Sequence, residues 1–300
     1  MGTVLLSVWG KGGVGKSTIA AALSLLARRR GYQRVLLVST DPTPSARRLL
    51  CENTGCYGVE VRELTEDDVK RLWVERFGDE VYEVVSSFLP VDRWIIDYVA
   101  GAPGIGDQFM LYYIDELVKS NRYDIVVWDT VAAGASLRLL RLEKEFYTHM
   151  GDAARLYLRV RSVLDKLRRG RRDPLELIES WRRLAEEILG MLASPSHRAL
   201  VVSEPSSLSL AVTRSIFSEL GLHGIRPRLV IANKVVETNP CPGCPLVEDV
   251  VGETRSLLDG LRGLGAPVLI VPYVTGEPRE RVRKIAEILG GETIVAEVLA

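Results

Sequence analysis

The sequence lacks an excess of charge of either sign. Its 300 residues carry 39 lysines and arginines against 39 aspartates and glutamates, so the formal net charge is zero. Proteins dedicated to nucleic acids usually carry a basic surplus, and this balance argues against that class. There is no run of about 18 or more apolar residues, which excludes a helix long enough to span a bilayer. No basic region precedes the apolar stretch 4–9, so we expect no signal peptide and predict a cytoplasmic protein.

Cysteine is also scarce, with four residues in the whole chain: Cys51, Cys56, Cys241 and Cys244. In a reducing compartment such cysteines are expected to be metal ligands or free thiols before disulfides. Apolar residues, by contrast, make up 47% of the chain, which is ample for a buried core in a protein of this length.

Short apolar runs that end in polar residues recur along the chain. They lie at 4–9, 35–40, 123–129, 198–203, 228–233 and 267–272. Continuous runs without alternation are typical of strands buried on both faces of a sheet. Helical stretches separate these runs, so we predict an α/β fold with a doubly wound, mostly parallel sheet.

Two segments interrupt this alternation of strands and helices. Residues 64–98 and 143–193 carry apolar side chains at helical spacing. The chain has neither internal repeats nor a low-complexity linker. We therefore predict one P-loop ATPase domain over residues 1–300, with a helical subdomain built from insertions at about 60–100 and 141–195.

A glycine-rich stretch follows the first predicted strand. Residues Gly10 to Ser17 fit G-x-x-x-x-G-K-[ST] and open a helix, which is the context that a phosphate-binding loop requires. Backbone N–H groups and the helix N-terminus would hold the phosphates, Lys16 would reach the β- and γ-phosphates, and Ser17 would bind Mg²⁺. The predicted nucleotide-binding residues of this segment are Gly10, Lys11, Gly12, Gly13, Val14, Gly15, Lys16, Ser17 and Thr18.

Three polar residues end other predicted strands. Asp41 is a candidate to orient or deprotonate the attacking water, and Asp129 to bind Mg²⁺ through water. Either aspartate alone is also typical of a helix cap, but together they favour hydrolysis. The amide of Asn233 could pair with the edge of adenine. A guanine-binding motif has a carboxylate three residues further on, where this chain has Val236, so adenine is favoured. A turn-forming asparagine is the alternative for Asn233.

A second lysine, Lys11, lies inside the loop. The pattern K-G-G-x-G-K-[ST] resembles the deviant Walker A ATPases, the group of plasmid-partition, septum-placement, nitrogenase-reductase and arsenical-pump ATPases. The resemblance implies a homodimer in which Lys11 crosses to the phosphates of the partner, where a cation stabilises the charge of the transition state. It also implies catalytic roles for Lys11, Lys16 and Asp41. A solvated lysine is the alternative.

Longer segments narrow the resemblance to one branch. STDPTPSARRL (39–49), APGIGDQ (102–108), DTVAAGASLRLL (129–140) and VPYVTGEPRE (271–280) are similar to segments of the arsenical-pump ATPase and of the tail-anchored-protein targeting ATPase of the guided-entry pathway. The resemblance implies that Pro272 and Tyr273 flank the base. It further implies a hydrophobic transmembrane-helix client and a membrane receptor. The sequence departs from this branch at Ala132, Ala133 and Ala135, where the family has Pro, Thr and His.

The CPGC stretch at 241–244 is a C-x-x-C motif. One pair supplies two thiolates, whereas a tetrahedral zinc site needs four, so two copies across a dimer axis would complete the set. The resemblance implies such a shared zinc at Cys241 and Cys244. Free thiols are one alternative, and a shared iron–sulfur cluster is another, because cluster-carrier ATPases of the deviant group also carry C-P-x-C. Cys51 and Cys56 are assigned no role.

The resemblance implies a homodimeric ATP hydrolase that opens and closes to target tail-anchored proteins. An arsenite pump motor is a weaker alternative, because no cysteine lies between Cys56 and Cys241 to bind arsenite. A partition or membrane-oscillating ATPase is weaker still, since the C-terminal ETIVAEVLA lacks a basic amphipathic helix. The helical stripes are expected either to pack on the core or to form a client groove, although they are richer in leucine and valine than in the adaptable methionine.

Overall fold

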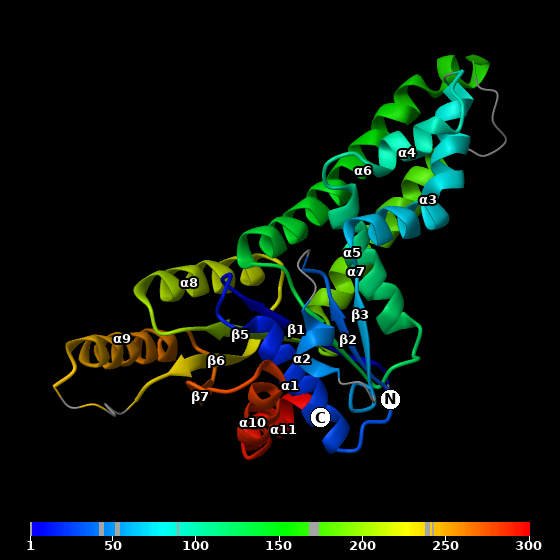
Figure 1. Cartoon of the computed structure of the whole chain (residues 1–300). Helices are drawn as coiled ribbons and strands as arrows, with labels where there is room; N and C mark the ends of the chain where they lie inside the picture. The colour runs from blue at the N-terminus through cyan, green and yellow to red at the C-terminus, as the bar shows by residue number, and fades with distance from the viewer. Residues whose placement is uncertain are drawn as a thin grey trace. The chain divides into compact units, whose positions relative to one another are not determined.

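A computed structural model describes most of the chain and divides it into two compact units (Figure 1). The described residues are 2–41, 45–51, 55–88, 90–167, 174–237, 241 and 243–300. The sheet unit comprises Met1–Leu64, Leu117–Leu137 and Ala193–Ala300. The helical unit comprises Thr65–Glu116 and Arg138–Leu192. The prediction of a single domain with a helical subdomain stays a prediction.

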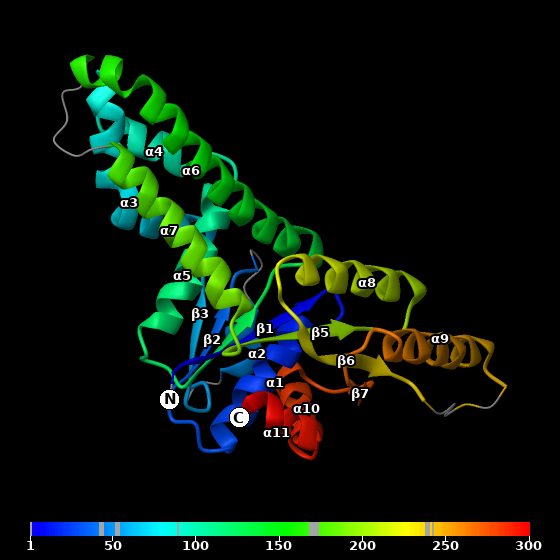
Figure 2. The same ribbon diagram turned by 180° about the vertical axis from the view of Figure 1, so that it is seen from behind.

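The sheet unit is built on seven strands in the order β3-β2-β4-β1-β5-β6-β7, and every pair of neighbours is parallel (Figures 1 and 2). Their bounds are β1 Val4–Gly10, β2 Val35–Ser39, β3 Val59–Glu63, β4 Ile125–Asp129, β5 His197–Ser203, β6 Pro227–Val235 and β7 Val268–Pro272. The predicted α/β fold is confirmed, and six strands coincide with the six apolar runs. Strand β3 was not predicted, because this edge strand alternates polar and apolar residues.

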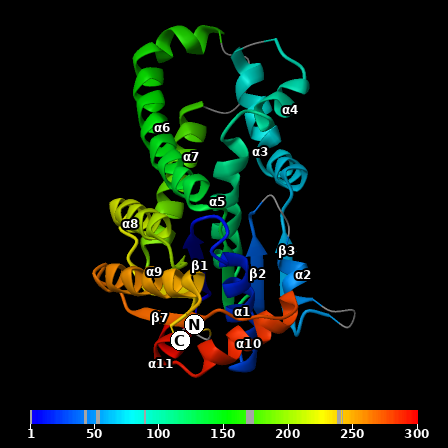
Figure 3. The same ribbon diagram turned by 60° about the vertical axis from the view of Figure 1, so that its left-hand side comes forward.

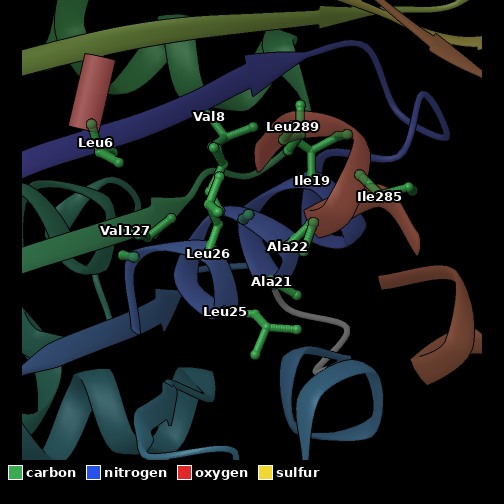
Figure 4. Close-up of a cluster of buried hydrophobic side chains, with 14 of the residues drawn as sticks. Leu6, Val8, Ile19, Ala21, Ala22, Leu25, Leu26, Val127, Ile285 and Leu289 are labelled. Carbon is green, nitrogen blue, oxygen red and sulfur yellow. The ribbon is translucent and has the colours of Figure 1, made fainter. Parts of the chain in front are cut away.

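Helices cover both faces of this sheet. They are α1 Lys16–Arg29, α2 Ala46–Leu50, α8 Ser207–Leu222, α9 Pro245–Arg262, α10 Pro278–Gly290 and α11 Thr293–Leu299. The main core lies between the strands and α1, α10 and α11. Helices α1 and α10 lie side by side (Figure 3), and Ile19 and Ala22 of α1 lie beside Ile285 and Leu289 of α10 (Figure 4). This packing fixes the N-terminus of α1, where the phosphate loop ends.

The helical unit draws on five helices. They are α3 Glu66–Phe88, α4 Trp94–Ala100, α5 Ile105–Lys119, α6 Ala133–Leu167 and α7 Pro174–Ala193. The stripe predicted within 64–98 buries Trp73, Phe77 and Val81, as an amphipathic helix should. The turn predicted near 168–174 falls mainly outside the described residues. Among the described helices, none is both long and apolar enough to cross a bilayer.

Two acidic side chains, Asp115 and Glu143, are almost completely buried in the helical unit. Burial and, next, the charge of Asp115 raise the pKa of Glu143 to about 8. In the unfolded chain this carboxyl has its ordinary pKa near 4.5, so it loses its proton at a much lower pH than in the folded protein. The folded state therefore binds the extra proton between these values, and the free energy of unfolding falls as the pH rises through that window.

Replacing the Glu143 carboxyl with an amide should remove the loss of folding stability that its ionisation causes as the pH rises. We expect Glu143→Gln to raise the free energy of unfolding at pH 8 by at most about 5 kcal/mol. At pH 4 both states of the wild type are protonated, so the gain should vanish. Thermal melts followed by circular dichroism at the two pH values measure this difference. Glu145→Gln, at an exposed position of the same helix, is the control, and an equal gain at pH 4 and pH 8 would contradict the assignment.

Candidate nucleotide site

The glycine-rich loop connects β1 to α1, as predicted. Gly10 ends β1, and a side chain there would meet the carbonyl oxygen of Val202 at 2.5 Å. Gly15 has a φ of 98°, in the left-handed region that favours glycine, and a side chain there would collide with Asn233. These two glycines therefore let the loop run against the ends of β5 and β6. The first turn of α1 follows directly, so its backbone N–H groups line the loop.

Lys16 is directed back into this loop. Its side chain is buried, and Nζ donates a hydrogen bond to the carbonyl oxygen of Lys11 at 3.3 Å. Burial lowers the pKa of Lys16, while the charges of Asp129 and Asp41 act in the opposite direction. The structure thus brings together the lysine of the loop and both aspartates that sequence analysis selected at separate strand ends.

Asp129 ends β4 and is 1% exposed. Burial raises its pKa to about 6, against hydrogen bonds from Ser17 and Ser39 and the charge of Lys16. Ser39 donates to Oδ2 at 3.1 Å, whereas Oδ1 has no hydrogen-bond partner within the described ranges. A buried carboxylate oxygen that still has an open acceptor, beside the Ser17 hydroxyl, fits the oxygen donors that Mg²⁺ prefers.

Asp41 lies just beyond the end of β2, half-buried, and its backbone N–H donates to Ser39 Oγ at 3.4 Å. Its charge acts on both Lys16 and Asp129. The segment that follows, residues 42–44, lies outside the described residues. The carboxyl ends of β2 and β4 are adjacent in the sheet, which explains how residues 88 positions apart come to share one site.

Lys11 points to a different partner. Its Nζ lies 3.5 Å from Oε1 of Glu204, and the side chain is 31% exposed. Glu204 also pairs with Lys234, whose Nζ lies 2.9 Å from Oε2 and donates to the carbonyl oxygen of Gly13. Neither Glu204 nor Lys234 was predicted from the sequence. The available signal was their position at the carboxyl ends of two parallel strands, beside the loop.

Neutralising Glu204 should strengthen nucleotide binding. We expect Glu204→Gln to lower the Kd for ATP about two- to tenfold, because two lysines beside the loop lose their counter-charge. Titration with a fluorescent ATP analogue at low and high salt measures the effect, which should shrink as salt rises. Glu287→Gln is the control, since Glu287 pairs with Arg29 at the opposite end of α1. Weaker binding in Glu204→Gln would show that this carboxylate mainly holds the loop in shape.

The predicted base-binding residues lie at the same edge of the sheet. Asn233 is buried near the end of β6, and its Nδ2 donates to the carbonyl oxygen of Val14 at 2.8 Å. This bond supports the phosphate loop, and the contact of Asn233 with adenine stays a prediction. Pro272 ends β7, and Tyr273 follows with a 60% exposed side chain. A flat exposed ring there is compatible with stacking on a base.

The four cysteines form two disulfides, Cys51–Cys56 and Cys241–Cys244. The expectation of free thiols is therefore not met in this structure, and metal binding by the reduced cysteines stays a prediction. The turns bring the paired Cα atoms within 4.0 Å and 5.7 Å of one another, so each pair of sulfurs is within bonding reach. No cluster of three or more His, Cys, Asp or Glu residues suited to a metal occurs in the described ranges. A single oxidised chain does not support the predicted zinc at Cys241 and Cys244.

The fold and this site define a class. The first strand of the parallel sheet leads through a glycine-rich loop with a buried lysine into a helix, and two aspartates lie at neighbouring strand ends. This combination defines a P-loop nucleotide hydrolase. The model of the anion-transporting ATPase family matches residues 3–289, and the chain belongs to that family. ATP hydrolysis is therefore its activity, and the family implies ATP together with Mg²⁺.

Individual relatives are distant but cover most of the chain. "Putative arsenical pump-driving ATPase 1" of Aquifex aeolicus is 24% identical over 94% of this chain and 78% of its own length. "ATPase get3" of Pyrenophora tritici-repentis is 24% identical over 94% of this chain and 89% of its own. "Protein Rv2184c" of Mycobacterium tuberculosis is 29% identical over 90% and 70%. The first two of these names agree with the branch that segments 39–49 and 129–140 resemble.

Proposed function

We propose that the chain works as a homodimeric ATPase in which each subunit supplies Lys11 to the ATP of its partner. The observation that carries the proposal is the different placement of the two lysines of the loop. Lys16 is buried and directed into its own loop, whereas Lys11 is partly exposed and held outside it by Glu204. A cation held at the rim of the loop suits a role across an interface, as an arginine finger does.

Within one subunit, the remaining groups have separate roles. Lys16 and the loop N–H groups bind the β- and γ-phosphates. Ser17 would hold Mg²⁺ directly and Asp129 through water, and the ion neutralises phosphate charge when it is bound. Asp41 orients the attacking water and accepts its hydrogen bond. Closure of the dimer brings Lys11 of each chain to the developing charge on the phosphoryl oxygens of the other.

Hydrolysis opens the dimer and releases a hydrophobic client, the transmembrane helix of a tail-anchored protein, to a membrane receptor. Two observations support this choice: segments 39–49 and 129–140 are similar to those of the guided-entry ATPase, and relatives carry the name get3. So do two exposed aromatic side chains on α4, Trp94 at 58% and Tyr98 at 70%, whose ring centroids are 6.0 Å apart. Exposed aromatic pairs of this kind favour contact with an apolar partner. This function corresponds to a cytoplasmic protein.

Co-expression with a tail-anchored substrate tests the client. The full chain should retain the substrate and not a version that lacks its membrane helix. Trp94→Ser with Tyr98→Ser should lose the client and keep ATPase activity. Leu222→Ser, at a 68% exposed position of the sheet unit, is the matched control. Failure of the wild type to retain the substrate, or undiminished retention by the double variant, would contradict the proposal.

An ATPase that drives an arsenite pump is the second candidate, because a relative carries that name. Arsenite binds soft thiolates, and the four cysteines are paired as disulfides in the structure. The ATPase rate with and without arsenite, in the presence of a reductant, separates the two candidates. Strong stimulation by arsenite without retention of a tail-anchored substrate would favour the pump motor.

A zinc ion shared between two chains requires Cys241 and Cys244, next to the N-terminus of α9, to be in the reduced form. We expect a reduced wild-type dimer to bind one zinc, with two thiolates from each chain. Cys241→Ser with Cys244→Ser should lose the metal and weaken the dimer without nucleotide, as metal analysis and sedimentation would show. A metal-free reduced wild type with an unchanged dimer would exclude the clamp, and brown colour after anaerobic purification would indicate an iron–sulfur cluster instead.

A further inference from the structure

The helical unit contains a pocket of about 150 Å³ that is lined by aliphatic and aromatic side chains. Residues from α3, α4, α5, α6 and α7 line it, so five helices of one unit contribute. The aromatic members are Trp73, Phe77, Phe109, Tyr112, Phe146 and Trp181. None of these residues belongs to the nucleotide site, and the pocket has no part in the function proposed above.

The rings are held in a network of edge contacts. The ring of Phe77 lies 5.1 Å from that of Tyr112 and 6.3 Å from that of Phe109, with interplanar angles of 64° and 90°. In an edge contact the positive edge of one ring meets a negative face of its neighbour, so the ring that offers its edge keeps its own faces for other groups. Arg76 lies against the cluster, with its guanidinium 4.6 Å from the centroid of Phe77 and 5.6 Å from that of Tyr112, and its Nε donates a hydrogen bond to the Tyr112 hydroxyl at 2.8 Å. This arginine is itself paired with Glu80 at 3.1 Å.

An acidic side chain completes the lining. Glu143 of α6 lines the pocket and is 3% exposed. Asp115 of α5, completely buried, acts electrostatically on it. A second carboxylate near a buried carboxyl makes its ionised form costly, and a positive charge in the pocket would relieve that cost. Aromatic faces around a buried acid are the combination with which proteins bind organic ammonium groups.

We propose that this pocket binds a small organic cation, an ammonium group with apolar substituents, with the aromatic faces around it and Glu143 as its counter-ion. The size limits the ligand. A cavity of about 150 Å³ in another protein holds one benzene ring, so a ligand of roughly six to eight non-hydrogen atoms fits. A whole client helix is far larger, and only one of its apolar side chains would fit.

Choline and its uncharged isostere 3,3-dimethylbutan-1-ol separate charge from shape. We expect the full chain to bind choline at pH 8 with a Kd of roughly 0.01 to 1 mM, by the ordinary affinity per atom of small ligands. The isostere should bind at least about tenfold more weakly. Isothermal titration calorimetry measures both. Equal affinities would show a plain apolar pocket and overturn the proposal, as would the absence of choline binding at about 10 mM.

Substitutions of residues that line the pocket test whether Glu143 is the counter-ion of the bound cation. Glu143→Gln should weaken choline at least about tenfold and leave the isostere unchanged, while its thermal midpoint shows that it is folded. Phe146→Leu, at a half-buried position, keeps an apolar side chain and loses a ring face, so it should weaken choline several-fold and spare the isostere. The Glu145→Gln control should bind like the wild type. Unchanged choline affinity in both lining variants would overturn the proposal.

Discussion

Replacing Lys11 with alanine is expected to lower the rate of ATP hydrolysis by about a thousandfold or more, which is the effect of losing a cation supplied across an interface. Binding of ATP should persist, because Lys16 and the loop N–H groups remain in place. Single-turnover hydrolysis, together with equilibrium binding of an ATP analogue, separates the two effects. A variant with near-normal turnover would refute the role of Lys11.

The control for Lys11→Ala is Lys234→Ala, because Lys234 is the other lysine that pairs with Glu204. Lys234→Ala also leaves Glu204 with one cation fewer, but Lys234 is bound to the loop carbonyl of Gly13 and belongs to the same chain. We therefore expect Lys234→Ala to affect the affinity for ATP more than the rate at saturating ATP. An equal loss of rate in both variants would indicate a general electrostatic effect at the loop rather than a specific contact of Lys11.

Replacing Asp41 with asparagine is expected to lower the rate of hydrolysis by roughly a hundred- to ten-thousandfold. Asparagine has the same shape but is a poor proton acceptor, so the attacking water loses its base. Affinity for ATP should stay the same or rise, because a negative charge near the phosphates is removed. Rapid-quench measurement at saturating Mg²⁺ and ATP tests this expectation. A variant that hydrolyses ATP at the wild-type rate would assign the water to another group.

Mixing the two inactive variants distinguishes a contact in trans from one in cis. In a heterodimer of Lys11→Ala and Asp41→Asn, one site combines an intact Asp41 with the intact Lys11 of the other chain. Random pairing in a two-fold dimer should therefore restore about a quarter of the wild-type rate. If Lys11 acts within its own chain, every site lacks one group and no activity returns. Recovery that disappears on dilution would confirm that two chains are needed.

The phosphate loop was predictable because its chemistry is local. The glycines, Lys16 and Ser17 are neighbours in sequence, and backbone geometry alone requires their order between a strand and a helix. The buried strands were predictable for a similar reason, since a strand covered on both faces must be apolar throughout. The edge strand β3 was missed because it needs no such run, and its residues alternate in burial.

The charge network beside the loop was not predictable from local pattern. Glu204 follows β5 and Lys234 lies near the end of β6, and Glu204 meets both Lys11 and Lys234 because β5 lies between β1 and β6 in the sheet. The disulfides were missed on a different ground. A reducing compartment favours free thiols over disulfides, and the prediction was based on that. Whether a disulfide can form depends instead on how close the turns bring the two Cα atoms of each cysteine pair.

By itself, the sequence determined the fold class, the phosphate loop and the family, because each rests on patterns that a short segment carries alone. Only the tertiary structure decided which distant charges meet. Glu204 holds Lys11, and Asp115 acts on Glu143 inside an aromatic pocket. The physical reason is that electrostatic interaction and burial depend on distance in space, and the order of strands and the packing of helices set that distance.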